Sequence, residues 1–286
     1  MSSFLSPAVP SLPTDSTFPV GLSSTAADAV SLVVSTLRAA GCVFAEEEAQ
    51  LLISEARTRN DLIAMVRQRA DGHPLEHVLG WAQFCGLRIA VDPGVFVPRL
   101  RTELLARQAT ALAARITDRP PIVVDLCCGS GAVAAALAAA LDSIELYAAD
   151  IEPAAVRCAR RNLASARVYQ GDLYEPIPRA LVGRIDVLIA NAPYVPTEAI
   201  GLLPAEARLH EPWVALDGGT DGLDVLRRVI AEACQWLAPG GSLLVESSDR
   251  QAPMIVETCN RSGLIARVAK CTELAATVVI GSKPAD

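Results

Sequence analysis

The stretch Ile185-Asp186-Val187-Leu188-Ile189-Ala190-Asn191-Ala192-Pro193-Tyr194 joins an apolar segment to a short group of polar and rigid residues. Residues 185–190 are rich in β-branched side chains and are typical of a buried parallel strand. Residues 191–194 then lie just beyond the carboxyl end of that strand, where open α/β sheets bind their ligands. An Asn amide, a backbone carbonyl held by a following proline and an aromatic ring suit a planar group that carries N–H bonds. We therefore expect transfer of a group to an amide or amino nitrogen.

Outward from this strand, strand-like and helical segments alternate, which predicts an α/β fold with a doubly wound, mostly parallel sheet of seven strands. The expected strands cover residues 122–127, 144–150, 166–170, 185–190, 241–246, 264–270 and 275–281. The expected helices cover residues 131–141, 153–164, 221–237 and 250–261.

The chain before this sheet has a different composition. Residues 1–20 are rich in Ser, Pro and Thr, and predict a disordered leader. Residues 21–80 predict a small helical domain, in which Ser24 or Thr25 caps the first helix. Residues 81–100 predict a β-hairpin that turns at Asp92-Pro93-Gly94 and links the helices to a second domain, 101–286.

Composition excludes several classes of protein. The chain of 286 residues is 51% hydrophobic and 20% charged, as expected of a soluble globular protein. Its formal charge of −7 and the lack of a long basic run disfavour a nucleic acid partner. No secretory signal and no apolar run of membrane-spanning length is present, so we expect a cytoplasmic protein without a membrane partner. The eight cysteines form no C-x-x-C pair, which indicates reduced thiols and no metal site.

A glycine-rich loop follows the first expected strand, in the sequence Asp125-Leu126-Cys127-Cys128-Gly129-Ser130-Gly131. Gly129 and Gly131 permit a tight turn and close approach of a ligand to the backbone. The G-x-G-x-x-A pattern is weak by itself. It is strengthened by Asp150, which lies 19 residues beyond Gly131 at the end of the next strand, where an acid accepts hydrogen bonds from ribose hydroxyls. Asp150 also suits a helix cap, and the two roles are compatible.

Both NAD and S-adenosylmethionine satisfy these features, and two further acids favour S-adenosylmethionine. Asp125 comes directly before the loop, where it would repel the pyrophosphate of NAD. Asp172 follows the third expected strand, where it can accept from an adenine amino group or serve as a simple turn residue. The predicted cofactor contacts are therefore Asp125, Cys127, Gly129, Gly131, Asp150, Asp172 and Asn191.

These motifs resemble those of the class I methyltransferases that act on planar nitrogens. More specifically, the chain resembles the protein-(glutamine-N5) methyltransferases of the HemK/PrmC type, which modify the Gly-Gly-Gln loop of peptide-chain release factors. The resemblance covers residues 46–244 and implies S-adenosyl-L-methionine as the cofactor and a protein substrate with a glutamine on an exposed loop. Its most specific segments are residues 74–80, 84–87, 93–99 and 211–223.

The resemblance implies roles for the tetrapeptide 191–194. The Asn191 side-chain oxygen and the Ala192 carbonyl would each accept one N–H of the glutamine amide, and Pro193 would hold that carbonyl in place. Tyr194 would hold the amide plane so that its nitrogen faces the methyl group. In this mechanism no charged base is required, because the proton can leave after the methyl group has arrived.

The chain also departs from the family pattern. Ala192 stands where the family has a first proline, so we expect a working but looser clamp. Residues 98–103 read Pro-Arg-Leu-Arg-Thr-Glu where the family reads P-R-P-E-T-E, and Glu246-Ser247-Ser248 replaces E-I-G. The helical domain is about 20 residues short, and residues 273–276 replace the final turn motif. These changes alter a substrate rim that includes Arg99 and Glu103, and predict a divergent paralogue.

Two other functions remain compatible with the sequence. The acceptor can be an amino group in a nucleic acid or a small molecule, within the same class of enzyme. The chain can also be a catalytically silent protein that binds the cofactor and has no acceptor.

Overall fold

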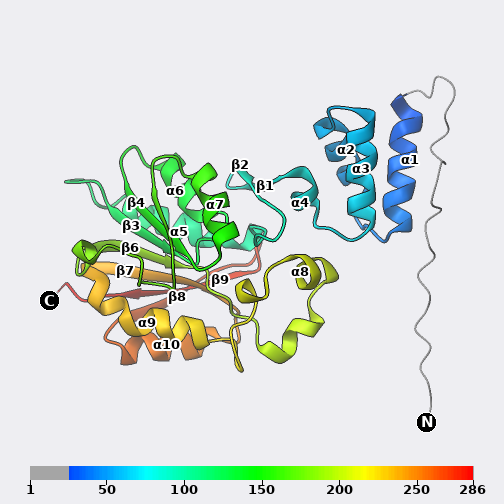
Figure 1. The fold of residues 1–286 in the computed structure, drawn as a ribbon. Helices are drawn as coiled ribbons and strands as arrows, with labels where there is room; N and C mark the ends of the chain where they lie inside the picture. Colours follow the sequence, from blue (N-terminus) through cyan, green and yellow to red (C-terminus); the bar gives the residue numbers. More distant parts are fainter. Residues whose placement is uncertain (1–25, 286) are drawn as a thin grey trace, which may run out of the picture.

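The computed structural model of this protein describes residues 26–285 (Figure 1). The expected leader, 1–20, and the expected cap at Ser24 or Thr25 lie outside the described residues. No helix within the described part of the chain is long and apolar enough to cross a membrane.

The N-terminal helices form a unit with a core of its own, set beside the sheet in Figure 1. Thr58 caps the third helix, because its hydroxyl accepts a hydrogen bond from the Asp61 amide at 3.1 Å. The buried side chains of this small core include Val33, Leu37 and Leu52. The helices are α1 (Ala26–Ala39), α2 (Ala45–Glu55), α3 (Arg59–Ala70) and the short α4 (Leu75–Leu79).

The expected β-hairpin is present, but its turn was placed wrongly. Strands β1 (Trp81–Phe84) and β2 (Leu87–Ala90) pair antiparallel around Cys85-Gly86, whose φ angles are +49° and +78°. A non-glycine residue rarely adopts positive φ, so Cys85 carried no turn signal. The predicted turn at 92–94 instead follows the hairpin, where the Val95 amide donates to the Asp92 carbonyl at 3.1 Å.

The central sheet confirms the predicted seven-stranded, mostly parallel arrangement. Its strand order is β5-β4-β3-β6-β7-β9-β8, with β9 antiparallel to both of its neighbours and the other pairs parallel. The strands are β3 (Ile122–Leu126), β4 (Glu145–Asp150), β5 (Arg167–Gln170), β6 (Ile185–Ala190), β7 (Leu237–Ser247), β8 (Ile265–Cys271) and β9 (Ala276–Ser282).

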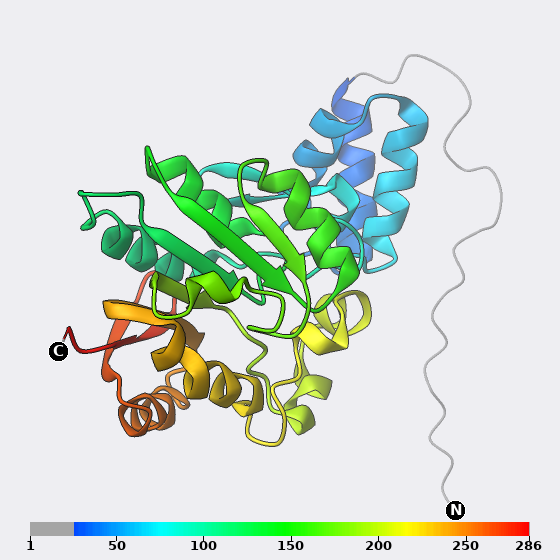
Figure 2. The ribbon, with the colours of Figure 1, turned by 60° about the vertical axis from the view of Figure 1, so that its left-hand side comes forward.

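Helices cover both faces of this sheet, as Figures 1 and 2 show. On one face lie α5 (Glu103–Ala113), α6 (Ala132–Ala140) and α7 (Pro153–Asn162), and on the other α9 (Asp224–Trp236) and α10 (Ala252–Arg261). Strand β6 contributes to both cores: Val187 and Ile189 pack on the first side, and Leu188 and Ala190 on the second. This double burial explains why the strand reads as a continuous apolar run.

A segment between β6 and α9 was not predicted. It contains the short α8 (Ala205–His210) and two 3₁₀ turns, Thr197–Leu202 and Trp213–Ala215. The segment contacts the N-terminal unit, because Arg69 of α3 bonds Glu206 of α8 at 2.7 Å and the rings of His73 and His210 lie 4.2 Å apart. It therefore connects the helical unit to the region above the sheet.

The site is positioned by the point where the strand order reverses. From β3 the chain continues to β4 on one side, whereas from β6 it continues to β7 on the other. The connections consequently diverge at the carboxyl ends of the adjacent strands β3 and β6, and leave an opening there for a ligand.

Candidate active site

A cavity of about 390 Å³ lies at the carboxyl ends of β3, β4 and β6. Two of the predicted site residues, Gly131 and Glu103, do not line it. The predicted residues that line it come from five separate segments of the chain: Arg99, Asp125, Cys127, Gly129, Asp150, Asp172, Asn191, Ala192, Pro193 and Tyr194.

Asp150 fastens the glycine loop to the end of β4. Its Oδ2 accepts a hydrogen bond from the Gly129 amide at 2.8 Å, and its Oδ1 accepts one from the Glu152 amide at 2.9 Å. Burial raises the pKa of this carboxyl, while the two amide bonds act to lower it. Because a carboxylate offers about four acceptor positions, Asp150 retains capacity for a ligand beside the two backbone bonds.

Asp125 is the most unusual acid in the cavity. Its side chain is buried, and no partner for its Oδ2 exists among the described residues. Burial raises the pKa of Asp125 to about 7, and the nearby Asp150 charge adds to the effect. A buried carboxylate oxygen without a partner costs free energy, so its position in a cavity indicates a site for a cationic or N–H-bearing ligand group.

The two glycines of the loop have different functions. Gly131 begins α6 at φ +78°, and a Cβ there would lie 2.8 Å from Leu163 Cδ1 and 3.3 Å from Ala159 Cβ. Gly131 is therefore required for packing of α6 against α7, and its contact with the cofactor stays a prediction. Gly129, at φ +55°, has open space where its Cβ would be, and it lines the cavity. Gly129 is the position where a ligand can approach the backbone.

Glu103, predicted at the substrate rim, contacts the β-hairpin. Its Oε1 accepts a hydrogen bond from the Cys85 amide at 2.9 Å, and its Oε2 pairs with Arg107 at 2.7 Å. The unexpected turn at Cys85 brings a free amide to the start of α5, and Glu103 satisfies it. The residue supports the β-hairpin and lies outside the cavity.

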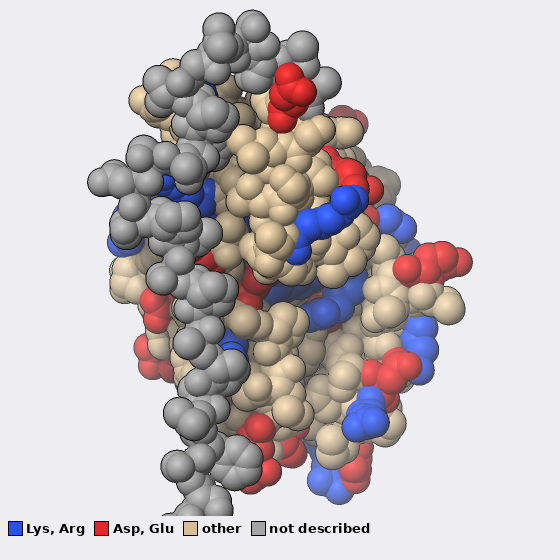
Figure 3. All heavy atoms as spheres, turned by 90° about the vertical axis from the view of Figure 1, so that its right-hand side faces the viewer, with Lys and Arg blue, Asp and Glu red and all other residues tan. Residues whose placement is uncertain are grey.

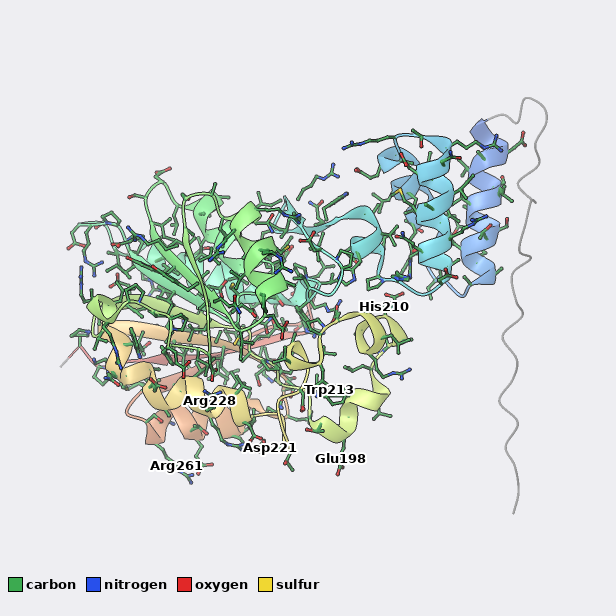
Figure 4. The ribbon with its side chains drawn as sticks, viewed as in Figure 1. Glu198, His210, Trp213, Asp221, Arg228 and Arg261 are labelled. Atoms are coloured by element: carbon green, nitrogen blue, oxygen red, sulfur yellow. The ribbon has the colours of Figure 1, made fainter. Side chains whose placement is uncertain are left out.

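Asp172 has a partner that the sequence did not reveal. Its Oδ2 accepts a hydrogen bond from Arg228 of α9 at 2.6 Å, and both side chains line the cavity. Figure 4 labels Arg228 on this helix, near the sheet. The ion pair occupies one carboxylate oxygen and leaves the other available to a ligand.

The residues of the predicted clamp lie together at the end of β6. Asn191 Nδ2 faces Thr102 Oγ1 at 3.5 Å, and its side-chain oxygen has no protein partner among residues 26–285. Ala192 is buried in the core between the sheet and α9. The Tyr194 carbonyl accepts from Gln251 Nε2 at 2.9 Å, so the loop is held from both ends.

Tyr194 belongs to a polar cluster that the sequence did not predict. Its hydroxyl donates to Glu246 Oε1 at 2.9 Å, and Arg101 Nε donates to the hydroxyl at 3.0 Å and to Glu246 Oε1 at 3.2 Å. Glu246 is buried, and its Oε2 has no partner among the described residues. Burial and the Glu246 charge raise the pKa of Tyr194, so the phenol stays neutral. Arg101 occupies a position where the sequence departs from the family pattern and Glu246 matches that pattern, but the sequence did not predict their contact.

Arg99 is held in place at the rim by a different acid. Its Nη2 donates to both oxygens of the buried Glu211, at 2.5 and 2.7 Å, and Glu211 also accepts from the Val97 amide at 3.3 Å. This pairing joins the stretch after the hairpin to the unpredicted segment around α8.

Within residues 26–285 no group of three metal-ligating side chains occurs, and all eight cysteines are free thiols.

This strand order, with a ligand cavity at the reversal point, defines a class I methyltransferase that uses S-adenosylmethionine. A methyltransferase from Pyrococcus furiosus shares the fold, with a TM-score of 0.51 at 18% sequence identity over 70% of this chain and 90% of that one. Residues 86–208 match the family described as "Methyltransferase small domain". The orphaned Asp125 oxygen and the open space at Gly129 fit S-adenosylmethionine as the cofactor.

Curated relatives define the family more closely. A protein of Geobacter sulfurreducens named "Release factor glutamine methyltransferase" is 36% identical over 203 residues, which cover 70% of this chain and 69% of that one. A protein of Streptomyces pristinaespiralis named "4-amino-L-phenylalanine/4-methylamino-L-phenylalanine methyltransferase" is 39% identical over 193 residues, 65% of each chain. The chain belongs to the release factor glutamine methyltransferase family.

Proposed function

We propose that this enzyme methylates N5 of a glutamine side chain in a protein substrate, and that a peptide-chain release factor is the first substrate to test. The observation that carries the proposal is the unpartnered Asn191 side-chain oxygen in the cavity, at the carboxyl end of β6. The names of the relatives support it. The same proposal places the enzyme in the cytoplasm, where release factors act.

A carboxamide nitrogen is a poor nucleophile, because its lone pair is delocalised into the carbonyl. Hydrogen bonds from its two N–H groups to the Asn191 oxygen and the Ala192 carbonyl would orient it and make it more electron-rich. Tyr194 would hold the amide plane, since Glu246 and Arg101 fix its hydroxyl. S-adenosylmethionine, when bound, supplies an electrophilic methyl group on a sulfonium.

The remaining cavity residues would hold the cofactor. Asp150 would accept from the ribose hydroxyls, while it also fastens the loop. Asp172 would accept from the adenine amino group with the oxygen that Arg228 leaves available. Gly129 and Cys127 would lie along the ligand, and the unpaired oxygen of Asp125 would accept from its ammonium group.

We also propose that the helical domain, 21–80, recognises the protein substrate. Exposed apolar side chains gather on and near α1 and α2: Leu32, Val43, Phe44 and Leu51. Apolar side chains on a surface are typical of protein contacts. Arg69 and Glu206 connect this unit to the segment that lines the cavity, so a bound protein would be held near the clamp.

The test is transfer of labelled methyl groups from S-adenosylmethionine to a purified release factor and to a lysate that lacks this protein. Asn191→Ala should reduce kcat about 100- to 1,000-fold at saturating S-adenosylmethionine. Arg261→Gln is the control, because Arg261 is an exposed residue of α10 (Figure 4) and should have no effect. Label that persists at full rate in Asn191→Ala would contradict the proposal, and label confined to a nuclease-sensitive fraction would indicate a nucleic acid acceptor.

A second candidate is methylation of an amino group on a small amino acid. The charged group Arg101 at the acceptor end of the cavity and the name of the Streptomyces pristinaespiralis relative support it. Transfer to 4-amino-L-phenylalanine without transfer to any protein in the lysate would establish this candidate over the first.

A further inference from the structure

We propose that Arg101 binds a carboxylate of the acceptor, so that the enzyme prefers acceptors that carry a negative charge next to the nitrogen it methylates. The inference rests on the proposed function for the place of the reacting nitrogen, beside Asn191. It assigns a substrate feature to a side chain at which this chain departs from the family pattern.

A second cavity, of about 400 Å³, lies beside the first. The two share Glu76, Pro98, Arg99 and Arg101 in their linings, so an acceptor at the clamp can extend from one into the other. The residues that line only the second cavity are apolar: Val97, Leu100, and Leu274 and Ala275 of the turn between β8 and β9. The charged groups therefore lie where the two cavities meet.

Arg101 has unused donors at this junction. A guanidinium carries five N–H groups, and Arg101 uses its Nε for Tyr194 and Glu246. Its two Nη atoms have no acceptor among residues 26–285, and its side chain is 45% exposed. The Nη2 of Arg99 donates to both oxygens of Glu211, so the charge of Arg99 is paired with that acid, although its Nε and Nη1 donate to no described residue.

The contacts on the Nε side prepare Arg101 for a ligand. The buried Glu246 holds the guanidinium against Tyr194 through Nε, and the planar Nη pair of Arg101, which lines both cavities, is left without a protein acceptor among the described residues. The Nη pair matches the two oxygens of a carboxylate in spacing and charge. Because the side chain is already positioned, less conformational entropy is lost when a carboxylate binds.

Glu76 is the acidic group at the junction, where it lies with Arg99 and Arg101, and its effect must be included. It is half-buried, lines both cavities and makes no hydrogen bond through its carboxylate to another described residue. Glu76 can accept from an N–H of the same acceptor, which is a backbone amide in a peptide or an ammonium group in a free amino acid. The effect of Glu76 on binding should therefore differ between an acidic peptide and a free amino acid.

The surface of the molecule is compatible with an anionic acceptor at this place. Figure 3, which faces the N-terminal helices, shows basic side chains recessed between uncharged surfaces near the middle of this face. The resemblance described above implies an acid at the position of Arg101, and an acid there would repel a carboxylate next to the reacting nitrogen. The change to arginine reverses that preference.

The test compares acceptors that differ by one charge. The first set consists of acetyl-Gly-Gln-Asp-amide and acetyl-Asp-Gln-Gly-amide, each against the same peptide with Asn in place of Asp. The second set consists of 4-amino-L-phenylalanine and its α-carboxamide. Binding to the full-length protein loaded with S-adenosylhomocysteine is followed by ligand-observed NMR titration, which requires no turnover.

In the unchanged protein, the anionic member of at least one set should bind about tenfold more tightly than its neutral match. Arg101→Gln should abolish this preference, and Arg101→Glu should reverse it, while Arg261→Gln keeps it. The ratio of the two affinities is measured on one and the same variant. It is therefore unaffected when a substitution lowers the folded fraction of the protein or displaces Tyr194. Equal binding of both members in every set, or a preference that persists in Arg101→Gln, would overturn the proposal.

Glu76→Gln identifies the source of the carboxylate. A preference in the peptide set that survives Glu76→Gln indicates an acidic residue next to the glutamine of a protein. Weaker binding of both members of the amino acid set in Glu76→Gln, with the charge preference of that set retained, indicates a free α-amino acid, because both members carry the ammonium group. Charge-dependent binding without methyl transfer would refute the proposed function alone, whereas transfer without a charge preference would refute the role of Arg101 alone.

Discussion

Arg69 of α3 bonds two acids at once: its Nε and Nη2 reach the buried Glu48 of α2 at 2.6 and 3.1 Å, and its Nη1 reaches Glu206 of α8 at 2.7 Å. One buried guanidinium thus connects the helical unit to the segment that lines the cavity. The two acids differ in environment, since the Glu48 side chain is 10% exposed and that of Glu206 is 44% exposed.

Substitution of this arginine should destabilise the protein far more than loss of its exposed partner. Arg69→Met leaves the Glu48 carboxylate buried without a counterion and should lower the free energy of unfolding by about 3–5 kcal/mol. Glu206→Gln should lower it by at most about 1 kcal/mol, because an exposed pair is screened by solvent. Glu206→Gln should, however, raise KM for a protein acceptor, because it loosens the contact between α8 and the helical unit.

Urea denaturation and steady-state kinetics measure both effects. Arg38→Gln is the matched control, because Arg38 pairs with Glu46 on the exposed side of the same helical unit. An Arg69→Met variant as stable as Arg38→Gln would show that the buried pair contributes little.

Substitution of Gly131 should mainly disturb packing, whereas substitution of Gly129 should mainly weaken ligand binding. Gly131→Ala places a methyl group 2.8 Å from Leu163 Cδ1 at a positive φ, and should lower the free energy of unfolding by about 2–4 kcal/mol. The new methyl group of Gly129→Ala meets no neighbouring atom. This substitution should therefore lower the free energy of unfolding by only about 1–2 kcal/mol, but it should weaken S-adenosylmethionine binding. Calorimetric titration of the cofactor and thermal unfolding of both variants test this division. Equal effects of the two substitutions on stability would contradict it.

The free energy of unfolding should depend on pH through the titration of Asp125. Burial raises the pKa of Asp125 to about 7 in the folded protein, against about 3.9 in an unfolded chain. Between those values unfolding releases a proton, so the free energy of unfolding should fall by about 1.4 kcal/mol for each pH unit as the pH rises. The stabilising contribution is complete below pH 4 and is lost as the pH rises to about 7.

Asp125→Asn should remove this slope, because the amide does not titrate. The difference in stability between the variant and the unchanged protein isolates Asp125 from other titrating groups, and should favour the variant increasingly from pH 4 to pH 7. The same variant should bind S-adenosylmethionine more weakly, since a charged acceptor is lost. A constant difference across this pH range would mean that Asp125 titrates normally.

Much of the fold could be predicted because the central strands are buried on both faces. Strand β6 was predicted at its observed bounds, since every residue from Ile185 to Ala190 is buried. Strand β7 begins at Leu237, four residues before its predicted start, because the strand continues through an irregularity at 238–241 that reads as a turn. The short α8 has no periodic pattern and depends on tertiary contacts such as that with Arg69.

Part of the site could likewise be predicted from the sequence, and part could not. Asp125, Asp150 and Asn191 could be predicted, because the carboxyl ends of parallel strands meet at one edge of the sheet. The contact between Arg101 and Glu246 joins residues 145 positions apart, and no local pattern encodes it. Gly131 was assigned to the cofactor because a glycine required for helix packing carries the same sequence signal as one required for ligand approach.

Ala192→Pro restores the residue that the resemblance implies at this position. No described residue accepts a hydrogen bond from the Ala192 amide, so the proline removes no backbone bond. The fixed φ of proline should stiffen the carbonyl that faces the acceptor and raise the free energy of unfolding by about 0.4–1 kcal/mol. We expect kcat for the acceptor to rise a few-fold, because the stiffer carbonyl orients the acceptor nitrogen more precisely. Kinetics and calorimetry of Ala192→Pro beside Ala192→Gly, which should change both quantities in the opposite direction, measure this. Unchanged kcat in both variants would show that rigidity at position 192 does not limit the reaction.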